Sequence, residues 1–218
     1  MNGNIRVLIV DDHALVRGAL SERLKREPGL DVVGGAGDAG EAIRMTLDHN
    51  PDIVVMDIDM PGMICFDAAR EIASLRPETR VIFLSAFLHD WYIQQALHVK
   101  ARGYLTKREP PEKVITAIRE VASGGAYFSE EVRARIVVDR NGATLSEDAK
   151  SLVSTLTTRE VEVLRYIARG LSKKEIAHIM HISAKTVDKH STNLMSKLRI
   201  HDRVELARYA IREGLAEA

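Results

Sequence analysis

Short apolar runs alternate with amphipathic stretches along the first 125 residues. Three of the runs, at 5–10, 53–56 and 81–84, are rich in β-branched residues and show no polar alternation, which is typical of strands buried on both faces of a parallel sheet. Two further runs lie at 31–35 and 101–105. The stretches between them predict helices at 15–25, 40–48, 66–75, 91–98 and 112–122. Five strands alternating with five helices predict a doubly wound α/β domain with a five-stranded parallel sheet.

The pattern changes after residue 125. The segment 126–153 is mostly polar and carries an Asn-Gly turn signal at Asn141, so we expect a linker there, with a short helix near 130–138. From residue 154 to 218 the chain has no strand alternation and no proline, and the spacing predicts four short helices at 159–169, 173–180, 185–198 and 203–213. Capping boxes are predicted at Thr157 with Glu160 and at Ser172 with Glu175. We therefore expect an α/β domain at 1–125, a linker at 126–153 and a small all-α domain at 154–218.

Composition narrows the class of protein. With 45% hydrophobic and 28% charged residues the chain is typical of a globular protein, and no apolar run approaches the roughly 20 residues of a transmembrane helix. A single cysteine, Cys65, excludes an internal disulfide framework and fits the reducing cytoplasm. The net charge of zero conceals a division, because residues 1–125 carry 15 basic against 18 acidic residues and residues 151–218 carry 12 against 8. A basic C-terminal part is a weak indication of nucleic-acid binding.

Polar side chains follow four of the predicted strands. Asp11 and Asp12 come after the first strand, Asp57 ends the third, and Ser85 and Lys107 follow the fourth and fifth. The carboxyl ends of parallel strands share one edge of the sheet, which is where this class of fold binds ligands. Three carboxylates there need a raised pKa or a cation, and their oxygens favour Mg²⁺. Asp11 and Asp12 are free to hold metal, so Asp57 is the candidate phosphoryl acceptor. One such acidic pair on its own would more often be part of a solvated loop.

Four segments carry a family resemblance. LIVDDHALVRGAL, VVMDIDMPGM, VIFLSAF and GYLTK resemble, in order and spacing, the receiver domain of two-component response regulators, over roughly residues 4–125. The resemblance implies a flavodoxin-like fold in which Asp57 receives a phosphoryl group from a sensor histidine kinase. It implies a Mg²⁺ site formed by Asp11, Asp12, Asp57 and the backbone carbonyl of Asp59.

The same resemblance implies roles for the remaining strand-end residues. Ser85 and Lys107 would contact the phosphoryl oxygens, and Tyr104 would be an aromatic switch that turns inward as the hydroxyl moves toward the phosphate. Cys65 is a departure, because the family usually has a glycine in this loop; we expect the loop after strand three to be reshaped and the thiol to act as a small apolar side chain.

The segment 172–198 predicts a helix, a short polar turn and a second helix. Ile176, Ala177 and Ile179 form the inner face of the first helix, and Val187, Leu194 and Leu198 form a matching stripe on the second. The opposite face of the second helix is polar, as in a helix that enters a major groove. Charge alone leaves a helical protein adaptor equally open.

A longer string, LTTREVEVLRYIARGLSKKEIAHIMHISAKTVDKHSTNLMSKLRIHDRVELARYAIREGL, is similar to the LuxR-type helix-turn-helix domain of NarL/FixJ regulators. The resemblance implies that residues 185–198 are the recognition helix and that residues 203–213 help to form a homodimer on double-stranded DNA. The DNA-contacting residues it implies are Lys173, Lys174, Lys185, Thr186, Asp188, Lys189, Thr192, Asn193 and Lys197. The dimer contacts it implies are Arg203, Leu206, Tyr209 and Ala210. Asp188 stands where a lysine is often found, so relatives do not predict the target sequence.

These features together predict a phosphorylation-dependent transcription regulator that is not an enzyme. Two alternatives remain open. The Asp57-Ile-Asp59 triplet also fits the nucleophile and acid of haloacid-dehalogenase-type phosphatases, although those place the triplet on the first strand. The chain could also act without phosphorylation, as a constitutive DNA binder or a protein adaptor.

Overall fold

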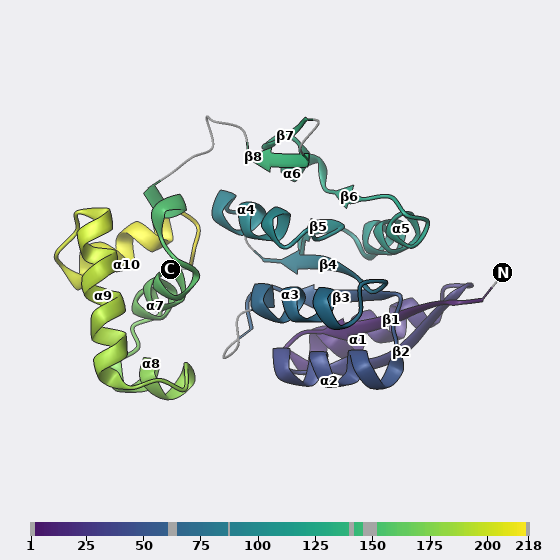
Figure 1. The fold of residues 1–218 in the computed structure, drawn as a ribbon, viewed down its shortest axis with the longest axis horizontal. Helices are drawn as coiled ribbons and strands as arrows, with labels where there is room; N and C mark the ends of the chain where they lie inside the picture. Colours follow the sequence, from purple (N-terminus) through teal and green to yellow (C-terminus); the bar gives the residue numbers. More distant parts are fainter. Residues whose placement is uncertain (1–2, 61–64, 87, 140–141, 146–151, 217–218) are drawn as a thin grey trace.

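The computed structural model describes residues 3–60, 65–86, 88–139, 142–145 and 152–216. An α/β part is joined to a helical part (Figure 1). The main sheet has six strands in the order β2-β1-β3-β4-β5-β6, and all of their pairings are parallel. Its strands are β1 Ile5–Val10, β2 Leu30–Ala36, β3 Ile53–Asp57, β4 Arg80–Ser85, β5 Gly103–Thr106 and β6 Tyr127–Phe128.

Helices cover both faces of this sheet, because alternate residues of each strand point to opposite sides. In β1, Val7 and Ile9 belong to one apolar cluster, which the helices α1 and α5 complete, whereas Leu8 and Val10 belong to the cluster that α2, α3 and α4 complete. The helices are α1 Ala14–Lys25, α2 Ala39–His49, α3 Cys65–Leu75, α4 Asp90–His98 and α5 Pro111–Ala122. The doubly wound prediction is confirmed, and five strands was one too few.

The sixth strand begins a segment that is more structured than a linker. After β6 come a one-turn helix, α6 Glu130–Arg133, and a hairpin of β7 Ile136–Asp139 with β8 Gly142–Leu145. The expected helix through residue 138 is therefore wrong beyond Arg133. Val132 and Leu145 are buried in the apolar cluster that lies over α4, so this segment packs on the α/β part rather than hanging between the two parts. The Asn141 turn signal lies outside the described residues.

The C-terminal part is helical, as expected. It contains a 3-10 turn, η2 Leu152–Thr155, and four helices, α7 Thr158–Ala168, α8 Lys173–Ile179, α9 Ala184–Leu198 and α10 Arg203–Arg212. Both predicted capping boxes are present, at the start of α7 and of α8. None of the helices in the described ranges is both long and apolar enough to cross a bilayer.

The two parts meet where α7 faces α4 and the end of β3 (Figure 1). The indole nitrogen of Trp91 on α4 donates a hydrogen bond to the Leu156 carbonyl at 3.3 Å. One apolar cluster runs without interruption through both parts and includes Phe66, Trp91 and Tyr166. The helical part is thus docked beside the strand ends at which the sequence places its polar residues.

Candidate functional site

Three carboxylates converge at the carboxyl edge of the sheet. Asp11 follows β1 and Asp57 is the last residue of β3, and both are buried, with 3% and 2% of their surface exposed. Asp12 is half-buried beside them. Ligand atoms of all three lie within 4.8 Å of one another, so the structure brings the predicted acidic cluster together.

An ammonium group lies in the same pocket. Lys107, just after β5, places its Nζ atom 2.8 Å from Asp11 Oδ2 and 3.0 Å from Asp57 Oδ2. Its backbone N–H donates to the carbonyl of Ser85 at 2.7 Å, which ties the start of this loop to the end of β4. One lysine thus bridges two of the three aspartates.

Burial dominates the electrostatics of Asp57. It raises the pKa of this carboxyl to about 6, against the opposing effect of the Lys107 charge and with a further increase from Asp11 and Asp12. Burial alone would lower the pKa of Lys107, but the charge of Asp57 and the hydrogen bonds to Asp11 and Asp57 raise it. At neutral pH the pocket therefore holds an ammonium and a largely ionised Asp57.

Ser85 and Tyr104 lie beneath these charges. Ser85 ends β4 and Tyr104 lies in β5, and neither exposes any surface. Their side chains share a hydrogen bond, and burial raises the pKa of the Tyr104 phenol. The tyrosine predicted as a switch thus already points inward in this arrangement.

The Asp59 carboxylate contacts the helical part. It forms ion pairs with Arg165 of α7 and with Arg169, the residue that follows this helix, the latter at 3.1 Å. The Arg165 guanidinium also lies 5.7 Å from the centre of the Tyr92 ring on α4. In this arrangement two guanidinium groups engage the Asp59 carboxylate, which argues against its role as the general acid of the phosphatase alternative. Sequence reasoning missed both arginines, because their role arises only when the two parts pack together.

Cys65 begins α3 and is 2% exposed. Burial raises the pKa of its thiol, so the protonated, unreactive form prevails. This supports the expected role as a small apolar side chain. The residues of the loop just before it, which the departure from the family was expected to reshape, lie outside the described residues.

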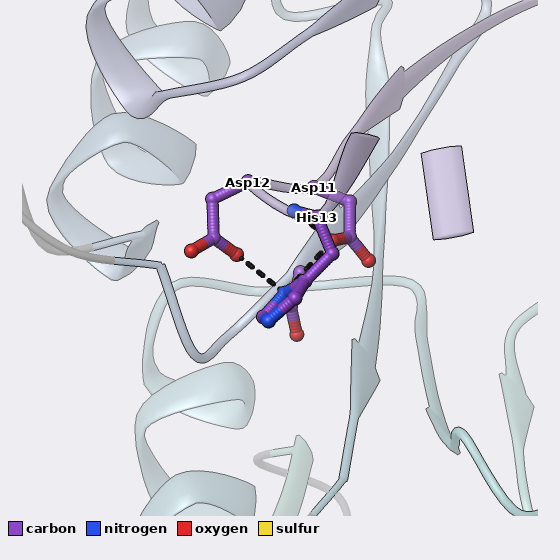
Figure 2. A group of neighbouring side chains, drawn as sticks. Asp11, Asp12 and His13 are labelled. Carbon is purple, nitrogen blue, oxygen red and sulfur yellow. Dashed lines mark hydrogen bonds and ion pairs between the residues drawn. The ribbon is translucent and has the colours of Figure 1, made fainter. Parts of the chain in front are cut away.

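The donor set fits a divalent cation. Asp57 Oδ1 is buried and has no hydrogen-bond partner, and Asp12 Oδ1 likewise accepts no hydrogen bond. Carboxylate oxygens with space for water or phosphate are the ligands that Mg²⁺ prefers. His13, which the sequence analysis did not select, places its Nδ1 atom 3.0 Å from Asp12 Oδ1 and 3.5 Å from Asp11 Oδ1 (Figure 2). Its position next to the two aspartates was the signal that could have revealed it.

In the helical part, α8 and α9 form the two helices of the predicted helix-turn-helix. Their inner faces are buried at Ile176, Ala177, Val187, Leu194 and Leu198, as expected, whereas the predicted inner residue Ile179 is only half-buried against the same cluster. Most of the predicted DNA-contacting side chains are exposed, namely Lys173, Lys174, Lys185, Asp188, Lys189, Thr192, Asn193 and Lys197. The outer face of α9 is therefore accessible in the docked arrangement.

Local partners modify three of these positions. The Lys197 ammonium lies 2.7 Å from Glu160 Oε2 and 3.1 Å from the Thr155 carbonyl, so it stabilises the start of α7. Lys173 forms an ion pair with Asp188, which joins α8 to α9. Thr186 is half-buried, with its hydroxyl 2.8 Å from that of Ser183 at the N-terminus of α9.

The predicted dimer contacts on α10 need correction. Leu206, Tyr209 and Ala210 are buried within the helical part, at 0%, 7% and 0% exposure, because α10 packs on α7. The Arg203 guanidinium donates a hydrogen bond to the Leu171 carbonyl. The exposed apolar residue of this helix is instead Val204, at 60%.

Two family models match the chain. The response regulator receiver domain matches residues 7–119, and the luxR family of bacterial regulatory proteins matches residues 154–210. Each match covers the part of the chain in which the structure shows the corresponding fold. The predicted resemblances are confirmed.

Relatives of full length agree with this division. The chain is 33% identical over 217 residues to the oxygen regulatory protein NreC of Staphylococcus epidermidis, and the match covers 98% of this chain and 100% of the relative. The corresponding NreC of Staphylococcus aureus is 34% identical over 216 residues, with the same coverage of both chains.

Among solved structures, a LuxR-family response regulator from Aurantimonas matches with a TM-score of 0.58 and 32% identity, over 61% of this chain and 94% of that one. RcsB of Salmonella enterica bound to promoter DNA shares the fold, with a TM-score of 0.67 and 23% identity over 95% and 98% of the two chains. The chain belongs to the two-component response regulators that join a receiver domain to a LuxR-type DNA-binding domain, a family of transcription regulators.

Proposed function

We propose that Asp57 accepts a phosphoryl group from a sensor histidine kinase, in the cytoplasm, and that this modification controls DNA binding by α9. The observation that carries the proposal is the pocket that joins Asp57 to Lys107 and to two further carboxylates. An Asp57 oxygen would attack the phosphorus while the bond to the donor nitrogen breaks and the imidazole leaves. Lys107, 3.0 Å from Asp57, is placed to balance charge on the transferred oxygens.

Asp11, Asp12 and Asp57, with the backbone carbonyl of Asp59, would hold Mg²⁺, which supplies positive charge beside the phosphoryl oxygens when bound. Ser85 ends the neighbouring strand, and its hydroxyl would donate a hydrogen bond to one of those oxygens. Because Ser85 is already hydrogen-bonded to Tyr104, its movement toward the phosphate would change the environment of the tyrosine. That pair couples chemistry at Asp57 to the face of the receiver at α4.

Labelling by a small phosphodonor tests the acceptor. Asp57→Asn should abolish incorporation of phosphate, because the amide is no longer a nucleophile. Asp48→Asn, which changes an exposed aspartate on α2, should label like the wild type. Undiminished labelling of Asp57→Asn would show another acceptor, and sustained turnover of a phosphomonoester by the wild type would favour the phosphatase alternative.

The proposed phosphate contacts are made by exposed lysines of α8 and α9, among them Lys189. Each phosphate contact releases counterions, so the slope of log affinity against log salt reports their number. We expect Lys189→Ala to weaken binding to a random-sequence duplex and to reduce the slope by about one. Lys113→Ala, on the exposed surface of α5 in the receiver, is the matched control. Equal effects of the two variants, or no salt dependence, would favour the adaptor.

We propose that two chains bind paired half-sites as a homodimer, with Val204 at the contact between their α10 helices. Val204 is the large apolar side chain of α10 that is exposed. Val204→Lys should reduce dimer formation on DNA in sedimentation measurements, because a charge would enter the contact. Val137→Lys, at an apolar residue of β7 that is 52% exposed, should have no effect. An unchanged dimer in Val204→Lys would place the contact elsewhere.

A further inference from the structure

His13 occupies the N-cap position of α1 but does not cap the helix. Its backbone is extended, with φ −79° and ψ 101°, and its side chain makes no hydrogen bond to the first turn. Side chains at this position usually accept from a backbone N–H of the helix. The His13 imidazole instead turns toward the aspartates (Figure 2).

A backbone contact holds the His13 main chain beside the aspartates. The N–H of His13 donates to Asp11 Oδ1 at 2.8 Å, so the histidine cannot move far from the carboxylates. Its side chain is 66% exposed and lies at the solvent side of the pocket, whereas Asp11 and Asp57 form the buried side. The imidazole therefore closes the ring of potential ligands from outside.

The distances from His13 Nδ1 to its two neighbouring carboxylates are close to those between adjacent ligands of one octahedral ion. With metal–ligand bonds of about 2.1 Å, adjacent ligands are about 3.0 Å apart and opposite ligands about 4.2 Å. His13 Nδ1 lies 3.0 Å from Asp12 Oδ1 and 3.5 Å from Asp11 Oδ1. One ligand atom each from Asp11, Asp12, His13 and Asp57 fits within 4.8 Å.

A second observation is a buried carboxylate oxygen in this pocket that has no hydrogen-bond partner. Asp57 is 2% exposed, and its Oδ1 atom has no hydrogen-bond partner. Within the described part of the chain, Lys107 is the one lysine or arginine in an ion pair with Asp11, Asp12 or Asp57. It approaches the Oδ2 atoms of Asp11 and Asp57, so it does not occupy Asp57 Oδ1 or the His13 nitrogen.

We propose that His13 Nδ1 is an additional metal ligand, which gives the receiver a preference for divalent first-row transition ions over Mg²⁺. Imidazole nitrogen suits the later transition ions, whereas Mg²⁺ is bound through oxygen. Removal of His13 should therefore weaken binding of Co²⁺ far more than binding of Mg²⁺. The inference rests on the metal site of the proposed function and adds a selectivity that three aspartates alone would not provide.

Calorimetric titration of the full chain with CoCl₂ and with MgCl₂ measures this selectivity. His13→Asn should weaken Co²⁺ binding by tenfold or more, on the scale of known losses at metal sites, and change Mg²⁺ binding by less than about threefold. His98→Asn, at an exposed histidine that ends α4, is the matched control. His178→Asn controls for weak binding by the pair His178 and His181, whose ring centres are 6.5 Å apart.

A spectroscopic readout tests ligation directly. In the Mn²⁺-loaded wild type, electron spin echo modulation should show a coupled ¹⁴N nucleus, which His13→Asn should remove and His98→Asn should retain. Suppose the wild type binds Mg²⁺ but shows no nitrogen coupling with Mn²⁺, and His13→Asn keeps its Co²⁺ affinity. That result would overturn the role of His13 and leave the proposed metal site standing. Failure of the wild type to bind either ion would overturn the proposed metal site as well. Circular dichroism of His13→Asn, and a second variant His13→Gln, separate loss of the ligand from loss of the fold.

Discussion

Asp57 is subject to two opposing effects at the residue scale. Burial disfavours its charged form, and the Lys107 ammonium at 3.0 Å favours it. Burial prevails, so the pKa rises from its ordinary value of 3.8 to about 6. A folded-state pKa above the unfolded one means that ionisation of this carboxyl destabilises the fold.

Asp57→Asn should therefore stabilise the protein in the absence of divalent ions. The destabilisation is absent below about pH 4, develops between pH 4 and 6, and is complete above pH 6, so the variant should gain about 3 kcal/mol at pH 7.5 and about 1 kcal/mol at pH 4.5. Urea unfolding in EDTA at both values measures the difference. Asp48→Asn is the control, and an equal gain at both pH values would exclude ionisation as the cause.

The residues of the candidate site could be predicted wherever their place depends on the position at which a strand ends. Asp11, Asp57, Ser85 and Lys107 were found because parallel strands end at one edge. The direction of a side chain is a different matter. Nothing in the spacing distinguishes a lysine that faces DNA from Lys197, which folds back onto Glu160.

At the element scale, local signals predicted helix starts well. Thr157 accepts a hydrogen bond from the Glu160 N–H, and the Glu160 side chain accepts one from the Thr157 N–H at 2.8 Å. Such a capping box needs only the right side chains three residues apart, so the sequence contains all of the information. The bounds of long elements with a clear apolar period were predicted to within one or two residues, because that period is also contained in the local sequence.

Loss of the α7 cap should loosen that helix. Thr157→Ala removes one acceptor at the helix start and should cost about 1 kcal/mol. Amide hydrogen exchange in the first turn of α7 should become about fivefold faster, while the receiver is unaffected. Thr158→Ala, one residue further along, is the matched control because that side chain does not cap the helix. Equal exchange in the two variants would contradict the assigned role of the cap.

Short elements escaped prediction because their stability comes from packing. β6 has two residues and exists by pairing with β5, and the β7–β8 hairpin lies against α4. The stripe Leu206, Tyr209 and Ala210 shows the same limit, since an apolar face has the same spacing whether it meets its own domain or a second chain.

At the scale of the whole molecule, the segment that follows β3 links the proposed phosphorylation site to the DNA-binding domain. The backbone of Asp59 lies two residues beyond the proposed acceptor, and its carboxylate is held by Arg165 and Arg169 of the DNA-binding domain. Burial, and then the neighbouring charge of Arg169, lower the pKa of Arg165 to about 10, so this guanidinium stays charged at neutral pH. A change in the loop after Asp57 would therefore reach α7 through a single ion-pair cluster.

Asp59→Asn should weaken the docking of the two domains. Two guanidinium groups would lose their shared counterion, at a cost to the docked arrangement of about 3 kcal/mol. Small-angle X-ray scattering should show a larger radius of gyration, and Trp91 fluorescence should change, because its hydrogen bond to Leu156 crosses the same contact. Asp67→Asn, whose carboxylate pairs with Arg70 within α3, should leave both signals unchanged. An unaltered radius in Asp59→Asn would show that other contacts maintain docking.

The hairpin after β6 sets a limit on how far the domains can separate. Since Leu145 is anchored on the receiver and η2 begins at Leu152, seven peptide units connect the two bodies. Even a fully extended chain of that length reaches at most about 25 Å. An undocked DNA-binding domain therefore remains near its own receiver domain. If two receivers associate, their two DNA-binding domains are held close together. This favours operators with closely spaced half-sites over widely separated ones.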